Sequence, residues 1–205
     1  MTRHRELVTM AMLPPPSRRG EGALFSANLV RSMTTASAGS LVTRTVGWGP
    51  RGSAGPPEGG VSGSRRDGGA DGAEIVEAIN AGPADVVLLQ YDSGCSPGEG
   101  ERDIVRLLQR LTAPVVTILH AFREEADPAD AEDLRRVCAA SRRVVVMNTR
   151  GLVMLRDRYG AAEHKLAVIP HGVPDMPPGG TDEDKRALGL SGRKVLLTFG
   201  PLGPD

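Results

Sequence analysis

Residues 85–119, DVVLLQYDSGCSPGEGERDIVRLLQRLTAPVVTIL, decide the fold. The stretch opens with the apolar run Asp85–Gln90 and closes with a second apolar run, 114–119. Between these runs, apolar residues recur at helical spacing: Ile104, Leu107, Leu108 and Leu111. Apolar runs without polar alternation are typical of strands that helices cover on both faces. The stretch therefore predicts a strand, a helix and a second strand, with Ser96–Glu99 as the start of the helix.

The same alternation continues on both sides of this unit. Expected strands lie at 7–12, 41–46, 143–147 and 165–169, and expected helices lie at 23–33, 74–80, 127–138 and 148–159. Alternating strands and helices favour parallel pairing with right-handed crossover connections. We therefore predict an α/β fold, a Rossmann-like doubly wound domain with a mostly parallel sheet.

Two segments depart from this pattern. Residues 47–72 contain ten Gly and three Pro, and we expect a flexible insertion because such a segment buries too little apolar surface to order itself. After residue 169 we expect a short helix capped by Thr181 and a final strand at Lys194–Phe199. We therefore expect a first domain over residues 1–175, followed in 176–205 by a linker and the first strand of an incomplete, truncated second domain.

Composition argues against several classes of protein. The 25 basic and 25 acidic residues give a net charge of zero, which disfavours a nucleic-acid partner. No run of 18 apolar residues occurs, and Pro14–Pro16 stands where a signal peptide would be cleaved, so neither a membrane span nor peripheral membrane association is evident. Cys95 and Cys138 have no metal-ligand spacing, so we expect two reduced thiols, no metal site and a cytoplasmic protein.

Candidate functional residues follow the expected strands, because ligands of parallel sheets bind at the carboxyl ends of the strands. His120 there can hydrogen-bond a sugar hydroxyl or steady charge in a transition state, or it can be a partly buried structural histidine. Asp92 can accept a hydrogen bond from an acceptor hydroxyl, or it can bond the backbone of its own turn. Asn148 is first a helix cap and second a sugar contact.

Glycines mark two further positions. Gly20 and Gly22 precede the first expected helix, where backbone N–H groups can approach a diphosphate, although an ordinary turn also needs glycine there. His171-Gly172 is expected to be a hinge. No GxGxxG motif follows the first strand, which disfavours a nicotinamide-dependent oxidoreductase, and no cofactor is expected.

Six segments in this order carry a resemblance to a known family: 13–22, 85–90, 114–120, 143–147, 165–173 and 195–200. Leu119-His120 after one strand and Ile169-Pro-His-Gly-Val173 after another stand at the spacing of that family. Over about residues 6–203, the chain resembles the N-terminal domain and interdomain hinge of a GT-B glycosyltransferase of the retaining, mannosyltransferase-like group, glycosyltransferase family 4.

The resemblance implies two Rossmann-like domains that face each other across a cleft, with the acceptor in the first domain and most of the nucleotide-sugar donor in the second. It also implies that no metal is needed, because cationic side chains and a helix N-terminus neutralise the leaving diphosphate. The partners would be a nucleotide-sugar and a glycosyl acceptor, either a small molecule or a glycan or lipid. The implied roles are catalysis for His120, donor binding for Gly20 and Gly22, acceptor binding for Asp92 and Asn148, and a hinge at His171 and Gly172.

The sequence also departs from the family pattern. Tyr91-Asp92 stands where the family usually has His-Glu, Asn148 stands where Ser is usual, and the basic and acidic donor-binding motifs of a second domain are absent. Whether this chain is itself an active enzyme is therefore left open. Two alternatives remain beside the transferase. The first is a non-enzymatic product, either a Rossmann-like binding or regulatory module or a decayed gene product. The second is a GT-B-fold nucleotide-sugar epimerase.

Overall fold

The computed structural model describes residues 8–13, 21–46, 72–93, 99–172 and 180–197. The chain divides into two compact units, residues 1–171 and residues 172–205. The first unit contains every described strand, whereas the described part of the second contains one short helix.

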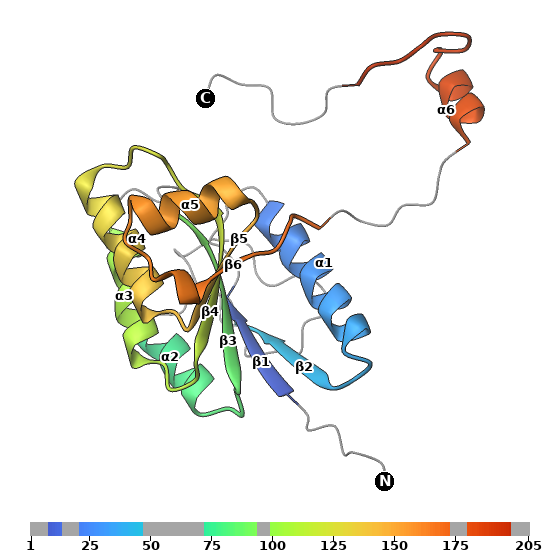
Figure 1. The fold of residues 1–205 in the computed structure, drawn as a ribbon. Helices are drawn as coiled ribbons and strands as arrows, with labels where there is room; N and C mark the ends of the chain where they lie inside the picture. Colours follow the sequence, from blue (N-terminus) through green and yellow to red (C-terminus); the bar gives the residue numbers. More distant parts are fainter. Residues whose placement is uncertain (1–7, 14–20, 47–71, 94–98, 173–179, 198–205) are drawn as a thin grey trace. The chain divides into compact units, whose positions relative to one another are not determined.

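A six-stranded sheet forms the centre of the first unit (Figure 1). Its strands are β1 (Val8–Leu13), β2 (Leu41–Thr45), β3 (Val86–Asp92), β4 (Val115–Ala121), β5 (Arg143–Val146) and β6 (Leu166–Val168). They lie in the order β2-β1-β3-β4-β5-β6, and all neighbouring pairs are parallel. The chain runs outward from β1 to β2, returns past β1 to β3, and then continues in the opposite direction. The predicted Rossmann-like α/β fold is thereby confirmed.

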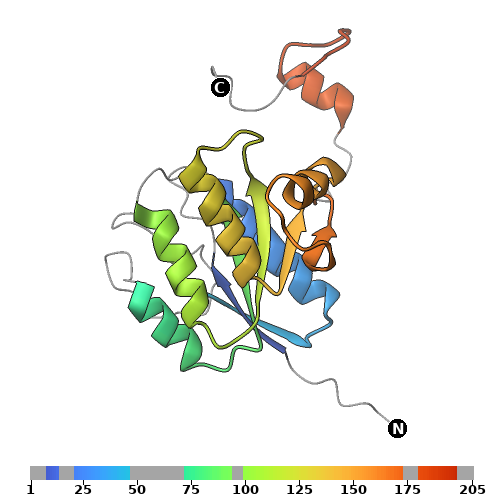
Figure 2. The same cartoon turned by 60° about the vertical axis from the view of Figure 1, so that its left-hand side comes forward.

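Helices cover both faces of this sheet. They are α1 (Glu21–Ala36), α2 (Gly72–Asn80), α3 (Glu99–Arg110), α4 (Pro128–Ala140) and α5 (Thr149–Asp157), with a 3₁₀ turn at Glu163–Lys165. Helix α1 lies on one face, and α2, α3 and α4 form a layer on the other, as both views show (Figures 1 and 2). The helices change face where the strand order changes direction, which is the property that defines a doubly wound sheet.

Alternate strand residues pack against different helical layers. The larger core, under α2 to α5, includes the fully buried Leu13, Leu89, Leu119, Ile79, Ile104, Leu134 and Leu155. The smaller core, under α1, includes Met10, Met12, Leu88, Ile118 and Val145. Because strand side chains alternate with a period of two, Gln90 and His120 follow Leu88 and Ile118 on the α1 face. The polar residues of interest therefore face α1.

Several boundaries differ from the expected ones. Strand β3 continues to Asp92, and β4 continues to Ala121, so His120 lies within its strand and not after it. Helix α1 begins at Glu21, so Gly22 lies in its first turn and does not precede it, contrary to the prediction. The expected cap at Asn148 is confirmed, because its side-chain oxygen accepts a hydrogen bond from the backbone N–H of Gly151. Asp127 caps α4 by accepting hydrogen bonds from two backbone N–H groups of that helix. The expected cap at 96–98 and nearly all of the expected insertion at 47–72 lie outside the described residues.

The second unit contains α6 (Thr181–Ala187). Thr181 was expected to cap this helix, but Gly180 occupies the cap position and Thr181 is the first helical residue. The strand expected at Lys194–Phe199 is not formed over residues 194–197, and residues 198–199 lie outside the described part. Leu196 and Leu197 are highly exposed. The assignment of this unit to a second domain stays a prediction.

Candidate functional site

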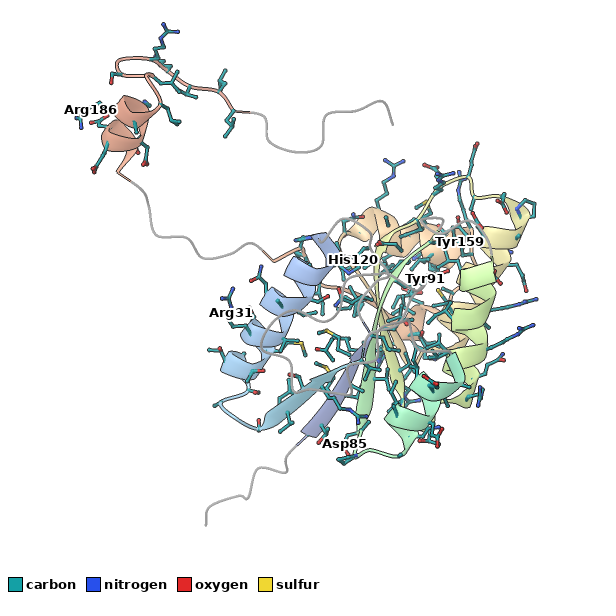
Figure 3. The ribbon with its side chains drawn as sticks, turned by 180° about the vertical axis from the view of Figure 1, so that it is seen from behind. Arg31, Asp85, Tyr91, His120, Tyr159 and Arg186 are labelled. Carbon is teal, nitrogen blue, oxygen red and sulfur yellow. The ribbon has the colours of Figure 1, made fainter. Side chains whose placement is uncertain are left out.

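The order of the strands directs attention to the carboxyl ends of β1 and β3. Strand order reverses between these two neighbours, and ligands of open parallel sheets bind at the carboxyl side of such a switch point. Tyr91 of β3 and His120 of β4 lie at this edge of the sheet, whereas Asp85 lies at the opposite edge (Figure 3). The residues at this edge are therefore the candidates for a site.

A buried glutamine forms hydrogen bonds to several elements at the carboxyl ends of these strands. Gln90 is fully buried, and its amide nitrogen lies 2.8 Å from Ser26 Oγ of α1 and 3.3 Å from Met12 Sδ of β1. Its amide oxygen lies 3.0 Å from His120 Nε2. A buried amide left without partners would destabilise the fold by about 1–3 kcal/mol. These bonds satisfy the amide and connect β1, β3, β4 and α1.

His120 is partly buried at the centre of this network. Burial lowers the pKa of its imidazole from the ordinary 6.5, the carboxylate of Asp92 acts in the opposite direction, and His171 lowers the pKa further. The neutral imidazole is therefore the form present at neutral pH. A neutral imidazole presents one donor and one acceptor, which suits a hydroxyl group better than a phosphate.

Phe25 of α1 brings a second histidine to the same place. Its ring contacts His120 with centroids 4.6 Å apart and an interplanar angle of 88°, and it contacts His171 with centroids 5.2 Å apart. Both contacts are edge-to-face, the favourable geometry for aromatic pairs. His171 follows β6, three strands away from β3, so this ring connects distant parts of the sheet edge.

Asp92, the last residue of β3, lies near His120. The pairing register of β3 and β4 shifts between Tyr91 and Asp92, so that Asp92 pairs with Ala121. Burial raises the pKa of the Asp92 carboxyl from 3.8, whereas His120 and a hydrogen bond from the backbone of Ala121 lower it. A carboxyl with a raised pKa beside an imidazole is an arrangement found at many catalytic sites. Asp92 and His120 interact electrostatically at the carboxyl ends of β3 and β4, where both were expected from the sequence.

The segment after His120 is anchored to α5 and the residues that follow it. Tyr159 donates a hydrogen bond of 2.5 Å from its hydroxyl to the carbonyl oxygen of Arg123, and its ring contacts Phe122. Glu124 forms ion pairs with Arg150 and Arg158 at 2.8 and 3.0 Å. These pairs are exposed, so each adds little to stability. Together these contacts hold residues 122–124, which follow the site, against α5 and the residues after it.

Asn148 has a structural role in this arrangement. Its side-chain oxygen accepts a hydrogen bond of 2.7 Å from the backbone N–H of Gly151, which caps α5. The side chain is exposed, and the described contacts do not join it to His120 or Asp92. The first of the two roles expected from the sequence is therefore observed, and a contact with an acceptor stays a prediction.

The remaining candidates from the sequence are the two glycines near the start of α1 and the expected hinge. Gly20 lies outside the described residues. Gly22 lies in the first turn of α1, the helix that supplies Ser26 and Phe25 to the site. The division between the two compact units falls between His171 and Gly172, the two residues expected to form a hinge.

The sequence alone assigned no site role to Gln90, Ser26 or Phe25. Gln90 ends an otherwise apolar run, and a polar residue at the carboxyl end of a buried strand is a signal that could have identified it. Ser26 and Phe25 had no comparable signal, because only the packing of α1 on the sheet brings them to Gln90 and His120.

Three further expectations from the sequence concern a metal site, the cysteines and a membrane span. Within the described residues, no group of three or more His, Cys, Asp or Glu side chains is arranged to hold a metal ion. Cys138 is a free, buried thiol whose pKa burial raises to about 11, so it is not a nucleophile at neutral pH. No helix in the described part of the chain has the length and apolar character needed to cross a bilayer.

Comparison with known proteins adds one informative likeness. No protein-family model matches the sequence, and no curated protein matches it. Solved structures do match, among them the glycosyltransferase from Rickettsia africae ESF-5, with a TM-score of 0.60 at 12% sequence identity. The match covers 90% of this chain and 50% of that chain, so this chain spans about half the length of the solved protein. The chain is therefore similar in fold, a parallel α/β sheet flanked by helices, to the matched half of a glycosyltransferase.

Proposed function

We propose that this chain is the acceptor-side part of a retaining, nucleotide-sugar-dependent glycosyltransferase that transfers a hexose to an acceptor. The observation that carries the proposal is the partly buried His120, held by Gln90 at the carboxyl edge of the sheet beside Asp92. The likeness in fold to the Rickettsia africae glycosyltransferase supports the same assignment.

In this proposal, His120 contacts the transferred sugar and Asp92 contacts the acceptor hydroxyl. A carboxyl whose pKa is raised from 3.8 is a stronger proton acceptor than an exposed one, and this property suits contact with a reacting hydroxyl. Asn148 would bind the acceptor from the end of β5. The Gly20–Gly22 region would bring backbone N–H groups at the start of α1 toward the donor diphosphate.

A second domain would complete the reaction. Transfer requires the sugar to be held between its acceptor and a diphosphate whose departing charge is neutralised. The cations for that neutralisation would come from the second domain, with His171-Gly172 as the hinge between the two. We therefore expect the 205-residue chain to bind nucleotide-sugars weakly and not to turn them over.

The test compares the 205-residue chain with a longer chain to which a complete donor-binding domain has been joined. Sugar transfer is measured with a panel of nucleotide-sugars and glycosyl acceptors. We expect transfer by the longer chain only, and a loss of about ten-fold to a thousand-fold in its His120→Ala variant. His164→Ala, the same substitution at an exposed histidine, is the matched control and should retain activity.

Other outcomes would assign the chain differently. Turnover by the 205-residue chain itself would overturn the half-site proposal, and full activity of His120→Ala would remove His120 from the site. Inversion of a sugar carbon without any acceptor would identify an epimerase. Binding without turnover in the longer chain would favour the non-enzymatic module.

A further inference from the structure

The orientation of the Gln90 amide follows from its neighbours. One of its two polar atoms lies 3.3 Å from the thioether sulfur of Met12, which can only accept a hydrogen bond. That atom must therefore be the amide nitrogen, which also donates to Ser26 Oγ at 2.8 Å. The other atom, which faces His120, is the amide oxygen.

This orientation determines which nitrogen of His120 carries hydrogen. An amide oxygen can only accept, so His120 Nε2, 3.0 Å away, must be the donor. In a neutral imidazole, a hydrogen on Nε2 leaves a lone pair on Nδ1. Among the residues that the structure describes, none donates a hydrogen bond to Nδ1 of His120.

We propose that Gln90 is a positioning residue that holds His120 in the Nε2–H tautomer, so that Nδ1 accepts a hydrogen bond from a ligand hydroxyl and not from a phosphate group. The second half of this inference rests on the proposed function, since it assigns the ligand group to a sugar; the first half concerns the protein alone. Gln90 itself is fully buried and acts only through His120.

The groups around His120 agree with a neutral imidazole. Two titratable groups act on it: Asp92 of β3 favours the charged form, and His171 after β6 disfavours it. Phe25 of α1 covers part of the ring. Burial outweighs the attraction of Asp92, so the charged imidazole that a phosphate would prefer is disfavoured.

The tautomer can be measured without any substrate. Long-range proton–nitrogen NMR on the full 205-residue chain, labelled with nitrogen-15, distinguishes protonated from unprotonated ring nitrogens. The His120→Gln spectrum identifies the His120 signals among the four histidines. We expect hydrogen on Nε2 and a bare Nδ1 at neutral pH; hydrogen on Nδ1 would overturn the proposal.

Variants then test whether Gln90 sets the tautomer. Gln90→Leu removes the acceptor, and we expect a mixture of both tautomers. Gln90→Glu keeps an acceptor at the same place, so we expect the Nε2–H tautomer to be retained and the pKa of His120 to rise, because the imidazolium gains a carboxylate partner. Gln109→Leu makes the same change at an exposed position of α3 and should leave the His120 signals unchanged.

A merely structural role of Gln90 would give a different result. If Gln90→Leu retains the wild-type tautomer, Gln90 does not position His120. If Gln90→Leu fails to fold, Gln90→Glu decides the question alone: an unchanged His120 pKa together with a mixed tautomer would overturn the proposal.

The ligand group is tested by titration of the same labelled chain. Methyl α-mannopyranoside supplies hydroxyls, and inorganic phosphate supplies oxyanions. We expect the glycoside to shift the Nδ1 signal of His120 and phosphate to leave it unchanged. A shift with phosphate, or with neither probe, would overturn the hydroxyl assignment. A confirmed tautomer without sugar transfer by the longer chain would reject the proposed function while the role of Gln90 stands.

Discussion

Gln90 Oε1 and His120 Nε2 lie 3.0 Å apart, and the hydrogen bond between them joins the carboxyl ends of β3 and β4. The same amide bonds Ser26 of α1, so one buried side chain connects the sheet to the helix that covers it. His120 is therefore held in place before any ligand arrives, as an efficient site requires.

The pH dependence of stability should report on His120. Its pKa is lowered from 6.5 in the folded state, so the unfolded chain binds more protons in the interval just below pH 6.5. The contribution of His120 to stability is therefore complete above that interval and is lost as pH falls through it. We expect the stability of the wild type, relative to His120→Gln, to decrease as pH falls below 6.5 and to stay constant above it in urea unfolding.

His164→Gln, at an exposed histidine, is the control for this experiment. A difference between wild type and His120→Gln that is constant with pH would contradict the prediction.

Asp92→Asn should stabilise the protein at neutral pH. The folded-state pKa of Asp92 is raised from 3.8, so the folded chain binds more protons in the interval above 3.8 and loses stability as pH rises through it. An amide removes the cost of burying the carboxylate while its oxygen still accepts from the backbone of Ala121. The measurement is the midpoint of urea unfolding, and the gain of Asp92→Asn should decrease in acid. A variant less stable than wild type at neutral pH would show that the carboxylate is stabilising.

Asn148→Ala should destabilise the protein by about 1 kcal/mol, since the cap of α5 is lost. Asp127→Ala is the comparison, because Asp127 caps α4 by accepting from the N–H groups of Ala129 and Asp130. Asn148→Asp retains the accepting oxygen and should keep near wild-type stability. Chemical denaturation measures all three. An Asn148→Ala variant as stable as wild type would mean that the cap bond adds nothing.

Removal of residues 177–205 should change the thermal unfolding of the first unit very little. All described buried apolar side chains lie between Met10 and Ala161, and α6 contains no buried residue. The truncated chain should unfold in one transition at nearly the same temperature. A broad or strongly lowered transition in calorimetry would show that residues 177–205 contribute to the core of the first unit.

Much of the fold could be predicted from local patterns. The apolar runs at β3 and β4 and the periodic apolar residues of α3 specify a parallel β-α-β unit, and all are present in the structure. Element ends were less predictable. The extension of β4 through His120 depends on pairing with β3, and the register shift between Tyr91 and Asp92 cannot be inferred from the sequence of either strand.

The second unit shows where local patterns fail. The apolar residues Val195–Leu197 predicted a strand, yet residues 194–197 form none. A strand requires a neighbour that pairs with its backbone, and the described residues supply none there. The pattern indicates that these residues are suited to a sheet, but only a partner strand can order them.

The sequence by itself determined the class of fold, the approximate positions of the strands and helices of the first unit, and the place of His120 and Asp92 at the carboxyl ends of their strands, because hydrophobic periodicity is a local property of the chain. Only the tertiary structure decided that Gln90, Ser26 and Phe25 belong to the site. Ser26 and Gln90 are 64 positions apart in the sequence. Gln90 and His120 are 30 positions apart. The contact of Ser26 with Gln90 depends on the packing of α1 against the face of the sheet on which Gln90 lies. It also depends on the requirement that a buried amide find hydrogen-bond partners.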